Sequence, residues 1–555
     1  MTGFEEKPVV NVGSNEKPVY FPQEVCRILP GQVYNGELAT VQRQNMIKFS
    51  CCHPPRNYES ITQDGLRIMG IENDQTVDSG IRVEKDMVIV PTRILSAPNL
   101  KYGTAKQTPR FGSWNLVGKR FCQGAPAPKK WTAILLRNRQ PPHADAERSQ
   151  ATRVSQALRS LYEQIATLGL QWPPPDDHVN IDIIGDKWRS GIDSMFKGAV
   201  SRGYKFLVVI LPTQEEQVFN HIKWAGDCKY GVLTHCCIAE KFLQGNPQYL
   251  ANNVMKINLK MGGICQALEM PQSSRLINAG KTMLVGLDVT HPSPTDPENF
   301  PSIACIVASI DGRLGQWPGE VRMQRRRQES VQFLQLMMEG RLDRWKAVNR
   351  QLPQNIIMYR DGVSDGQFPT VLKDELQQIR DACQKKYPGS QPNITIIIVS
   401  KRHHVRFYPT KEGDADRTSN PVNGMVVDRG ITRHGLWDFY LQAQAPLQGS
   451  ARPAHYVVLH DEIFTNRNAN PDGKPSDTLQ ELSHNICYIM GRCTRSISFS
   501  TPAFLADKFC DRARKYVRAY YAQLFDARGY NPNPPPPEPE ITDLAADVSE
   551  SMVYI

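Results

Sequence analysis

The sequence lacks the long apolar runs and paired cysteines that mark several classes of protein. Its longest apolar stretches, such as 206–211 and 394–399, have the length of a strand and are too short to span a bilayer. It has 13 cysteines but no C-x-x-C pair, which argues against a disulfide framework and a structural zinc site. Its first residues also lack the apolar segment of a secretion signal. We therefore expect no membrane partner and a cytoplasmic location, with the nucleus as the alternative.

Basic residues are missing from the end of the chain. No Lys or Arg follows Arg528, whereas the last residues carry several acids. The whole chain has 66 basic and 56 acidic side chains, a net charge of +10, so the part before the tail is more basic than the total. This balance is compatible with a polyanionic ligand but does not by itself establish one. The length of 555 residues suggests about three or four domains.

The pattern of apolar residues predicts an α/β protein. Up to about residue 125 the chain is rich in turns, with a strand-like run at 87–91. From about residue 130, strand patterns alternate with helical ones, which predicts a parallel sheet. A second α/β unit starts near residue 281 and ends in a proline-rich stretch, 531–540, that we expect to be an exposed loop. The strand patterns are 132–136, 205–211, 283–288, 303–310, 356–359, 394–400 and 456–459, and the helical patterns are 148–165, 215–224, 328–345, 370–387, 477–490 and 503–525.

Acidic residues follow two of these apolar strands. Asp288 comes after Leu284-Val-Gly-Leu287, and Asp361 comes after Asn355-Ile-Ile-Met-Tyr-Arg360. The carboxyl ends of strands in an open α/β sheet are where ligands bind. Two carboxylates there would repel unless a cation lay between them, and Mg²⁺ prefers such oxygen ligands. A pair of ions could then support phosphodiester cleavage. The alternative is that each acid only caps a turn or a helix.

Two lysines share one face of a predicted helix. Lys256 and Lys260 are four residues apart in a helical pattern. By themselves they are better explained as a solvated face than as a binding site.

Four motifs resemble the signatures of the PIWI domain of eukaryotic Argonaute proteins, and some features suggest a fungal member. They are Gly286-Leu-Asp-Val-Thr-His-Pro292, Tyr359-Arg-Asp-Gly-Val-Ser-Asp-Gly-Gln-Phe368, Lys401-Arg-His-His404 and Arg492-Cys-Thr-Arg-Ser496. The resemblance implies a Rossmann-like MID domain followed by a PIWI domain with the RNase H fold, preceded by a small mixed linker region. The implied boundaries are 1–30 for the end of a PAZ domain, 31–125 for linker 2, 126–276 for MID and 277–555 for PIWI.

The resemblance also implies a catalytic set. Asp288 and Asp361 would be the first two metal-binding acids, and Asp507, in Pro502-Ala-Phe-Leu-Ala-Asp507, would be the third. Glu329, in an Arg-Gln-Glu context, matches the inserted catalytic glutamate of the family. The implied cofactor is two ions of Mg²⁺ or Mn²⁺.

A second set of residues is implied for the 5′-phosphate of a guide strand. Two of them depart from the common pattern of the family, since Phe219 replaces a Tyr and His235 replaces a Gln. Phe219 can stack on a base but lacks a hydroxyl, so the preferred first base stays open. The implied phosphate-binding residues are Phe219, Lys223, His235, Lys256, Lys260 and Arg512.

The resemblance implies that the chain binds a small guide RNA and cleaves a complementary target RNA. The alternatives are a guide-binding silencing scaffold that works through cofactor proteins without cleavage, and an unguided RNase H-like nuclease. Because the chain matches the family only from the end of PAZ onward, we also expect the 3′ end of a bound guide to be unanchored.

Overall fold

The computed structural model describes residues 9–14, 17–27, 29–34, 38–71, 80, 83–138, 144–183, 185, 187–269, 275–278, 280–294, 296–470, 473–528 and 539–555. It divides the chain into two compact units, Met1–Cys52 and His53–Ile555. The first unit holds an antiparallel pair, β1 (Val9–Asn11) and β2 (Tyr20–Pro22), and helix α1 (Thr40–Ser50). Most of the proline-rich segment, 531–538, lies outside the described residues, so the prediction of a loop there is untested.

The second unit begins with a connecting segment that reaches two different sheets. It contains α2 (Pro54–Glu59), α3 (Leu66–Ile68), β3 (Arg93–Ile94), β4 (Asn99–Tyr102) and β5 (Ala105–Gln107). Strand β3 pairs with the large sheet, while β4 pairs with β5 and with β10 (Ala267–Glu269). The strand predicted at 87–91 is wrong: the backbone there is irregular, and Val88 and Ile89 are exposed instead of packed against a neighbour.

A four-stranded parallel sheet follows, in the order β7-β6-β8-β9. Alternate residues of β8 pack on opposite sides, because successive side chains of a strand face opposite ways. Val208 and Ile210 join the core with α4 and α8, whereas Leu207 and Val209 join the core with α5 and α6. This is the Rossmann-like layer order that the strand and helix alternation predicts. Its elements are β6 (Thr132–Arg137), α4 (Ala144–Thr167), β7 (Val179–Asp182), α5 (Trp188–Ser201), β8 (Phe206–Leu211), α6 (Glu216–Trp224), β9 (Leu233–Ile238), α7 (Ala239–Phe242) and α8 (Pro247–Lys260).

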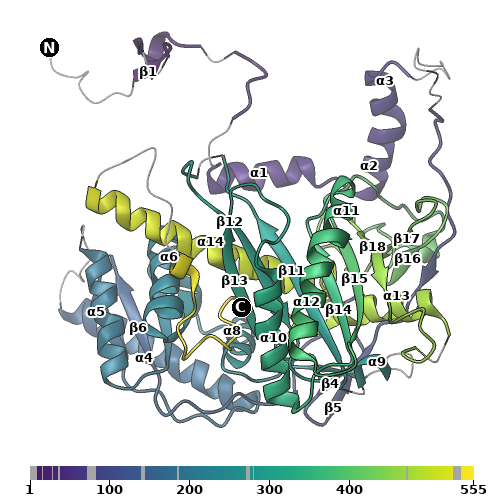
Figure 1. Cartoon of the computed structure of the whole chain (residues 1–555). Helices are drawn as coiled ribbons and strands as arrows, with labels where there is room; N and C mark the ends of the chain where they lie inside the picture. The colour runs from purple at the N-terminus through teal and green to yellow at the C-terminus, as the bar shows by residue number, and fades with distance from the viewer. Residues whose placement is uncertain are drawn as a thin grey trace. The chain divides into compact units, whose positions relative to one another are not determined.

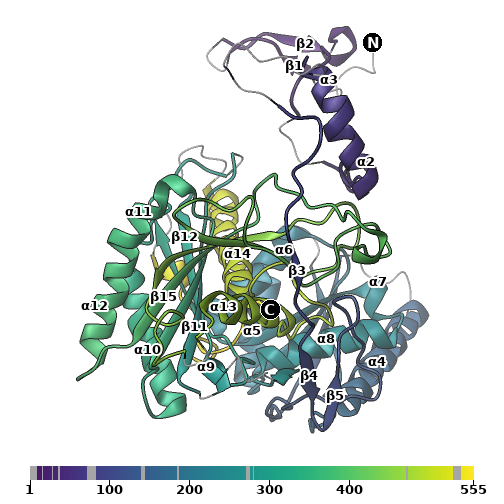
Figure 2. The same cartoon turned by 90° about the vertical axis from the view of Figure 1, so that its right-hand side faces the viewer.

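The larger sheet has nine strands in the order β13-β12-β11-β14-β15-β18-β17-β16-β3. Its centre is the parallel trio β11, β14 and β15, flanked by antiparallel strands. Figures 1 and 2 show helices α10 and α12 on one side of this sheet and α14 on the other. Its strands are β11 (Thr282–Thr290), β12 (Ser302–Ala308), β13 (Gly319–Gln324), β14 (Asn355–Asp361), β15 (Asn393–Ser400), β16 (Met425–Val427), β17 (Trp437–Gln442) and β18 (Ala454–Asp461).

The helices around this sheet are α9 (Arg275–Asn278), α10 (Leu334–Asn349), α11 (Phe368–Thr370), α12 (Leu376–Lys386), α13 (Pro475–Asn485) and α14 (Thr501–Arg528). The four helical patterns predicted here are confirmed except at their ends, whereas the short α9 was not predicted. The helix predicted from residue 328 begins only at Leu334, because the preceding residues form turns and Arg327 has a left-handed φ of 59°. Glu329 therefore lies on a loop.

Helix α14 packs against β11 and α6, so it joins the two sheets. Gly286 permits this contact, because a Cβ there would lie 1.9 Å from the carbonyl oxygen of Pro502. In the described part of the chain, no helix is both long enough and apolar enough to cross a membrane.

Candidate active site and anion pocket

The two strand-end acids lie on neighbouring parallel strands. The register of β11 and β14 pairs Leu287 with Arg360, which brings Asp288 and Asp361 to the same edge of the sheet. Strand β11 does not stop at Asp288, as its apolar run suggested, but continues to Thr290 because β12 extends the pairing. Burial, the neighbouring Asp361 carboxylate and, more weakly, Asp507 hold the pKa of Asp288 well above its usual range.

Asp507 approaches the same edge from the start of α14. Its charge raises the pKa of Asp361, after burial as the larger cause, to about 6. Asp507 itself is paired with Lys508, whose Nζ lies 3.0 Å from Oδ2. Three carboxylates from three elements therefore act on one another electrostatically, and their mutual repulsion is not fully offset by nearby cations.

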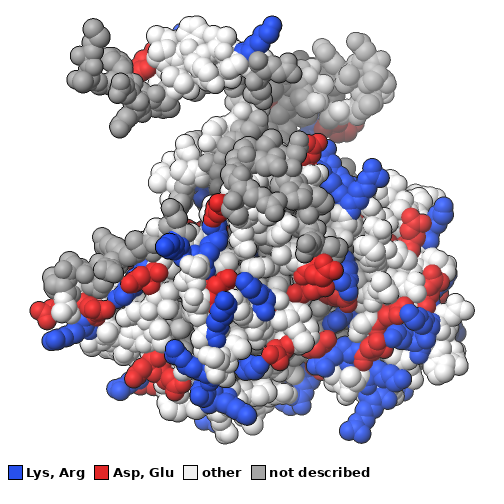
Figure 3. All heavy atoms as spheres, turned by 60° about the vertical axis from the view of Figure 1, so that its left-hand side comes forward, with Lys and Arg blue, Asp and Glu red and all other residues white. Residues whose placement is uncertain are grey.

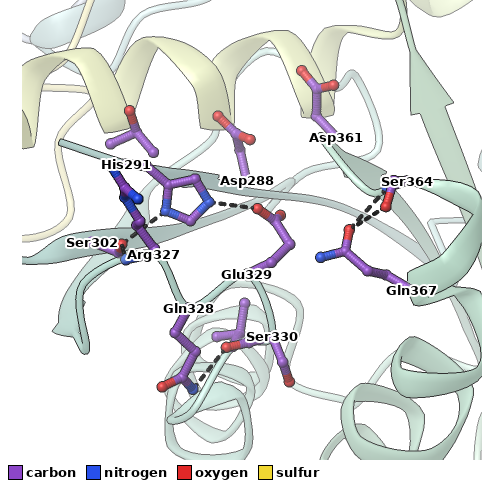
Figure 4. Close-up of polar contacts among 12 residues, drawn as sticks. Asp288, His291, Ser302, Arg327, Gln328, Glu329, Ser330, Asp361, Ser364 and Gln367 are labelled. Atoms are coloured by element: carbon purple, nitrogen blue, oxygen red, sulfur yellow. Dashed lines mark hydrogen bonds and ion pairs between the residues drawn. The ribbon is translucent and has the colours of Figure 1, made fainter. Parts of the chain in front are cut away.

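Glu329 enters this region from the loop before α10 (Figure 4). Its Oε2 lies 2.8 Å from His291 Nε2, and its Oε1 lies 3.0 Å from Nη2 of the buried Arg360. The other ring nitrogen of His291 lies 2.8 Å from Ser302 Oγ. A Cβ on Gly362 would lie 3.5 Å from Asp288 Oδ1 and 3.6 Å from Glu329 Oε1, so both oxygens border the same space. Glu329 and Asp288 thus face the same narrow space.

His291 and Arg360 hold the glutamate, and the sequence analysis missed both. Arg360 also donates from Nη2 to the backbone carbonyl of Glu329 at 2.8 Å and pairs through Nε with the buried Glu375 at 3.2 Å. The sequence did contain a signal for both residues, because His291 and Arg360 lie in the same motifs as Asp288 and Asp361. An arginine inside an otherwise apolar strand needs a buried acidic partner, which could have drawn attention to it.

The chemistry of this acid cluster fits a hard divalent cation. It offers only carboxylate oxygens, which Mg²⁺ prefers, and it carries repulsion that a cation would relieve. The described residues nevertheless contain no three His, Cys, Asp or Glu side chains arranged tightly enough to be a ready-made metal-binding group. The carboxylates that interact at this edge are Asp288, Asp361 and Asp507, with Glu329 beside them.

A cluster of buried lysines lies beside β9, the edge strand of the four-stranded sheet. Lys223, on α6, donates to the Thr234 carbonyl oxygen at 2.9 Å and to its Oγ1 at 2.8 Å. Lys260, the last residue of α8, donates to the same carbonyl oxygen at 3.0 Å. Burial, followed by the charges of Lys223 and Arg512, lowers the pKa of Lys260 well below its usual range.

The remaining predicted pocket residues surround this pair. His235 Nε2 lies 3.1 Å from Asn253 Oδ1, and burial with the charges of Lys260 and Lys256 lowers its pKa well below its usual range. The half-buried Lys256 shares the helix of Lys260, and the ring centroid of Phe219 lies 5.5 Å from Lys223 Nζ. Protonation of His235 is disfavoured here, because it would add a further buried positive charge.

Arg512 reaches this pocket from α14. Its Nη1 lies 2.9 Å from Oδ2 of the buried Asp227, which also accepts a hydrogen bond from Tyr516 at 2.8 Å. Asp227 thereby balances Arg512, whereas Lys223 and Lys260 donate to the neutral oxygens of Thr234 and form no ion pair with a described side chain. Buried cations of this kind fit an anionic ligand, since burying unpaired charge is unfavourable.

The face drawn in Figure 3 does not display this charge. On the face drawn in Figure 3, basic and acidic side chains are interspersed and form no single large patch. The excess positive charge of the pocket instead sits on buried side chains, Lys223 and Lys260. The structure brings together all six residues predicted for phosphate binding.

Helix α14 carries both Arg512 and Asp507, about 7.5 Å apart along its axis. One helix thus contributes to both predicted sites.

Comparisons with known proteins agree with this architecture. Residues 206–518 match the model of the Piwi domain, and residues 56–102 match that of the Argonaute linker 2 domain. The chain is 32% identical over 544 residues to protein argonaute 5 of Arabidopsis thaliana, covering 93% of this chain and 52% of the relative. It is 34% identical over 501 residues to protein argonaute of Schizosaccharomyces pombe, covering 89% and 57%.

A solved structure is similar over nearly the whole chain. The crystal structure of Kluyveromyces polysporus Argonaute with a guide RNA superposes with a TM-score of 0.82 at 26% identity, covering 99% of this chain and 62% of that one. The chain thus spans about half the length of the curated relatives it matches. On the Piwi-domain match and these relatives together, the chain belongs to the Piwi domain family, among the eukaryotic Argonautes.

Proposed function

We propose that this chain binds the 5′-phosphate of a small guide RNA and uses that guide to direct cleavage of a complementary RNA. The observation that carries the cleavage proposal is the gathering of Asp288, Asp361 and Asp507 at one edge of the large sheet. The solved relative with a guide RNA supports the guide as the ligand. The predicted division into linker, MID and PIWI segments belongs to the same proposal.

The buried lysines would hold the guide. Lys223, Lys256, Lys260 and Arg512 supply charged donors for a terminal phosphate, and charge-assisted hydrogen bonds of this kind are short and strong. His235 would add a donor, and the ring of Phe219 offers a surface on which the first base can stack. Base pairing along the guide would then select the target.

The acid cluster would carry out the hydrolysis. Asp288, Asp361 and Asp507 would hold two Mg²⁺ or Mn²⁺ ions, with Glu329 completing the set. When bound, two such ions activate a water and stabilise the leaving oxygen of a phosphodiester. His291 and Arg360 would keep the Glu329 carboxylate turned toward the other acids. The products would be a 3′-hydroxyl and a 5′-phosphate.

Incubation of the chain with a 5′-phosphorylated guide and a labelled complementary RNA in Mg²⁺ tests the proposal. We expect one guide-dependent cut, lost in Asp288→Ala while guide binding is retained. The matched control is Asp365→Ala, an exposed acid just after β14 that pairs with Arg433. Guide binding without any cut would instead indicate a silencing scaffold, and cutting without a guide would indicate an unguided nuclease.

The pocket is tested separately by Lys260→Ala. A hydrogen bond to a charged group contributes about 1.5–3 kcal/mol, so a 5′-phosphorylated guide should bind roughly tenfold more weakly or worse. A 5′-hydroxyl guide should be barely affected. Equal losses for both guides, removed by added salt, would mean that Lys260 contributes only general attraction to the backbone.

A further inference from the structure

The loop that carries Glu329 is held by side chains instead of by regular secondary structure. Residues 325–333, between β13 and α10, form no helix or strand. Gln324, the last residue of β13, donates from Nε2 to the Gln328 carbonyl oxygen at 2.7 Å and to the Ser330 carbonyl oxygen at 3.2 Å. Backbone groups away from water need such partners. The carbonyl groups on both sides of Glu329 are therefore bound by one glutamine.

Two side chains bind the next residues of this loop from α12 and from the turn before it. Glu375 Oε1 accepts a hydrogen bond from the Val331 backbone N–H at 3.2 Å, and Gln378 Nε2 donates to the Val331 carbonyl oxygen at 2.9 Å. Gln378 Oε1 also accepts a hydrogen bond from the backbone N–H of Gln335, at 3.2 Å. This N–H lies in the first turn of α10, where it has no partner within its own helix. Both backbone groups of Val331, two residues after Glu329, are thus held by one helical segment.

Glu375 also connects this loop to β14. Its fully buried carboxylate contacts Arg360 twice, with 3.2 Å from Nε to Oε2 and 3.2 Å from Nη2 to Oε1. Nη2 of the same arginine lies 3.0 Å from Glu329 Oε1. Glu375 therefore binds the loop backbone through Val331 and, through Arg360, the side chain of Glu329.

Glu375 reaches this position from an unusual helical turn. The segment Val371–Glu375 is π-helical and joins α11 to α12. Such π-turns are rare and frequently lie at functional sites. A buried ion pair is by itself weak evidence for stability, because the desolvation of two charges offsets their attraction. The pair of Glu375 with Arg360 is therefore better explained by the loop that it holds than by stability.

We propose that Glu375 and Gln378 are positioning residues that keep the Glu329 carboxylate beside Asp288. The inference rests on the proposed cleavage activity and adds two residues to it, which act through the loop and through Arg360. Displacement of a reacting group by about 1 Å can lower a rate about 100-fold. Release of the loop should therefore slow cleavage and leave the affinity for guide and target unchanged.

The main test is Gln378→Ala, which removes two hydrogen bonds to the loop region without unpairing a buried charge. We expect the single-turnover rate of guided cleavage to fall about tenfold or more. The dissociation constants for the guide and for the target should match the wild type. The matched control is Gln377→Ala, because the exposed Gln377 donates to Asp381 of the same helix, at 2.8 Å. This control should change neither the rate nor the affinities.

Glu375→Gln tests the second residue. It keeps the shape of the side chain but removes the charge that Arg360 contacts, so the rate should fall further than in Gln378→Ala, by about 100-fold. Denaturant midpoints show whether each variant is folded. If Glu375→Gln does not fold, Gln378→Ala still decides the inference, since it leaves the buried ion pair intact.

Hydrogen exchange gives a second readout that needs neither RNA nor a metal ion. In the metal-free protein, Gln378→Ala should speed the exchange of residues 329–335 about tenfold and leave β11 and β14 unchanged, because only local contacts are lost. Gln377→Ala should leave all of these segments unchanged.

Three outcomes would overturn the inference. Unchanged exchange of residues 329–335 would show that Gln378 does not hold the loop. Faster exchange there with an unchanged cleavage rate would show that the position of Glu329 does not depend on this hold. Equal increases in β11 and β14 would reduce the effect to a general loss of structure. Failure of the proposed function is recognised without any variant, since the wild type would then make no guide-dependent cut.

Discussion

At the scale of a single residue, the ionised carboxylate of Asp361 lowers the stability of the folded protein. Its pKa is raised to about 6 by burial and by Asp507, so the folded chain binds a proton more readily than the unfolded one. Stability that is present at low pH is therefore lost as the pH rises through the folded pKa. With an ordinary value near 3.8, the shift corresponds to about 3 kcal/mol at neutral pH.

We predict that Asp361→Asn stabilises the metal-free protein at pH 7 by about 1–3 kcal/mol while abolishing cleavage. Denaturant unfolding in a chelating buffer measures the first effect, and the guided cleavage assay measures the second. Asp365→Asn is the control with the opposite sign, because Arg433 holds the pKa of that exposed carboxyl low. A loss of stability in Asp361→Asn would contradict the electrostatic account of the cluster.

The buried His484 should make the free energy of unfolding depend on pH in the acid range. It is buried on α13 with its ring 5.2 Å from that of Tyr488, and burial lowers its pKa from 6.5 to about 4. The neutral form is favoured in the fold, so its stabilising effect is present above pH 6.5 and is lost as the pH falls toward 4. This shift amounts to about 3 kcal/mol.

We therefore expect His484→Gln to flatten the fall in unfolding free energy between pH 7 and pH 4.5. The exposed His434 provides the comparison, since His434→Gln should leave that slope unchanged. Urea unfolding at several pH values gives the slope directly. An unchanged slope in His484→Gln would mean that His484 binds its proton equally in the folded and the unfolded protein.

At the scale of one element, α14 is held to the four-stranded sheet by ion pairs of very different burial. Asp227 and Arg512 are both buried, whereas Glu216 and Arg518 have side-chain exposures of 55% and 34%. Breaking a buried pair leaves an uncompensated charge and typically costs about 3–5 kcal/mol. An exposed pair is worth about 1 kcal/mol or less.

Asp227→Ala should therefore lower the unfolding free energy by about 3–5 kcal/mol, and Glu216→Ala by less than about 1 kcal/mol. Each variant removes the acidic partner of one arginine on α14, so the denaturant midpoints of the two variants can be compared directly. Equal and small losses would show that water reaches Arg512 once its partner is removed.

At the scale of the molecule, the last residues connect the two sheets. Ala545 donates to the Asp227 carbonyl oxygen at 3.0 Å, and Lys205 lies 2.6 Å from Asp547 Oδ2. The buried Tyr554 donates to the Trp317 carbonyl oxygen at 2.5 Å, beside the large sheet. One short segment thus contacts both sheets and α14.

Removing one anchor of this segment should loosen both sheets. Tyr554→Ala empties a buried aromatic site, which costs about 3–5 kcal/mol. Hydrogen exchange should then increase in β8 as well as in β12, whereas Asp547→Ala, at an exposed pair, should change neither. Faster exchange confined to the surroundings of Trp317 would show that the sheets unfold independently.

Much of the fold follows from local sequence. The apolar runs of β8, β11, β14 and β15 are short, bounded by turns and separated by helical patterns, so the two α/β units can be predicted without tertiary information. Helix ends were predicted less well, as at α10, because the turns before it depend on contacts with the sheet.

The sequence by itself determined Asp288 and Asp361 near the carboxyl ends of β11 and β14 and the two lysines on one face of α8, since strand direction and helical period set those positions. Motif resemblance added Asp507 and Glu329. Only the tertiary structure decided the partners: Arg512 meets Asp227 across 285 residues, and His291 meets Glu329 across 38. Such contacts arise where α14 crosses from one sheet to the other and where a loop folds over the sheet edge. Neither has a local period, so the placement of Lys515 over Phe219 could not be predicted from sequence.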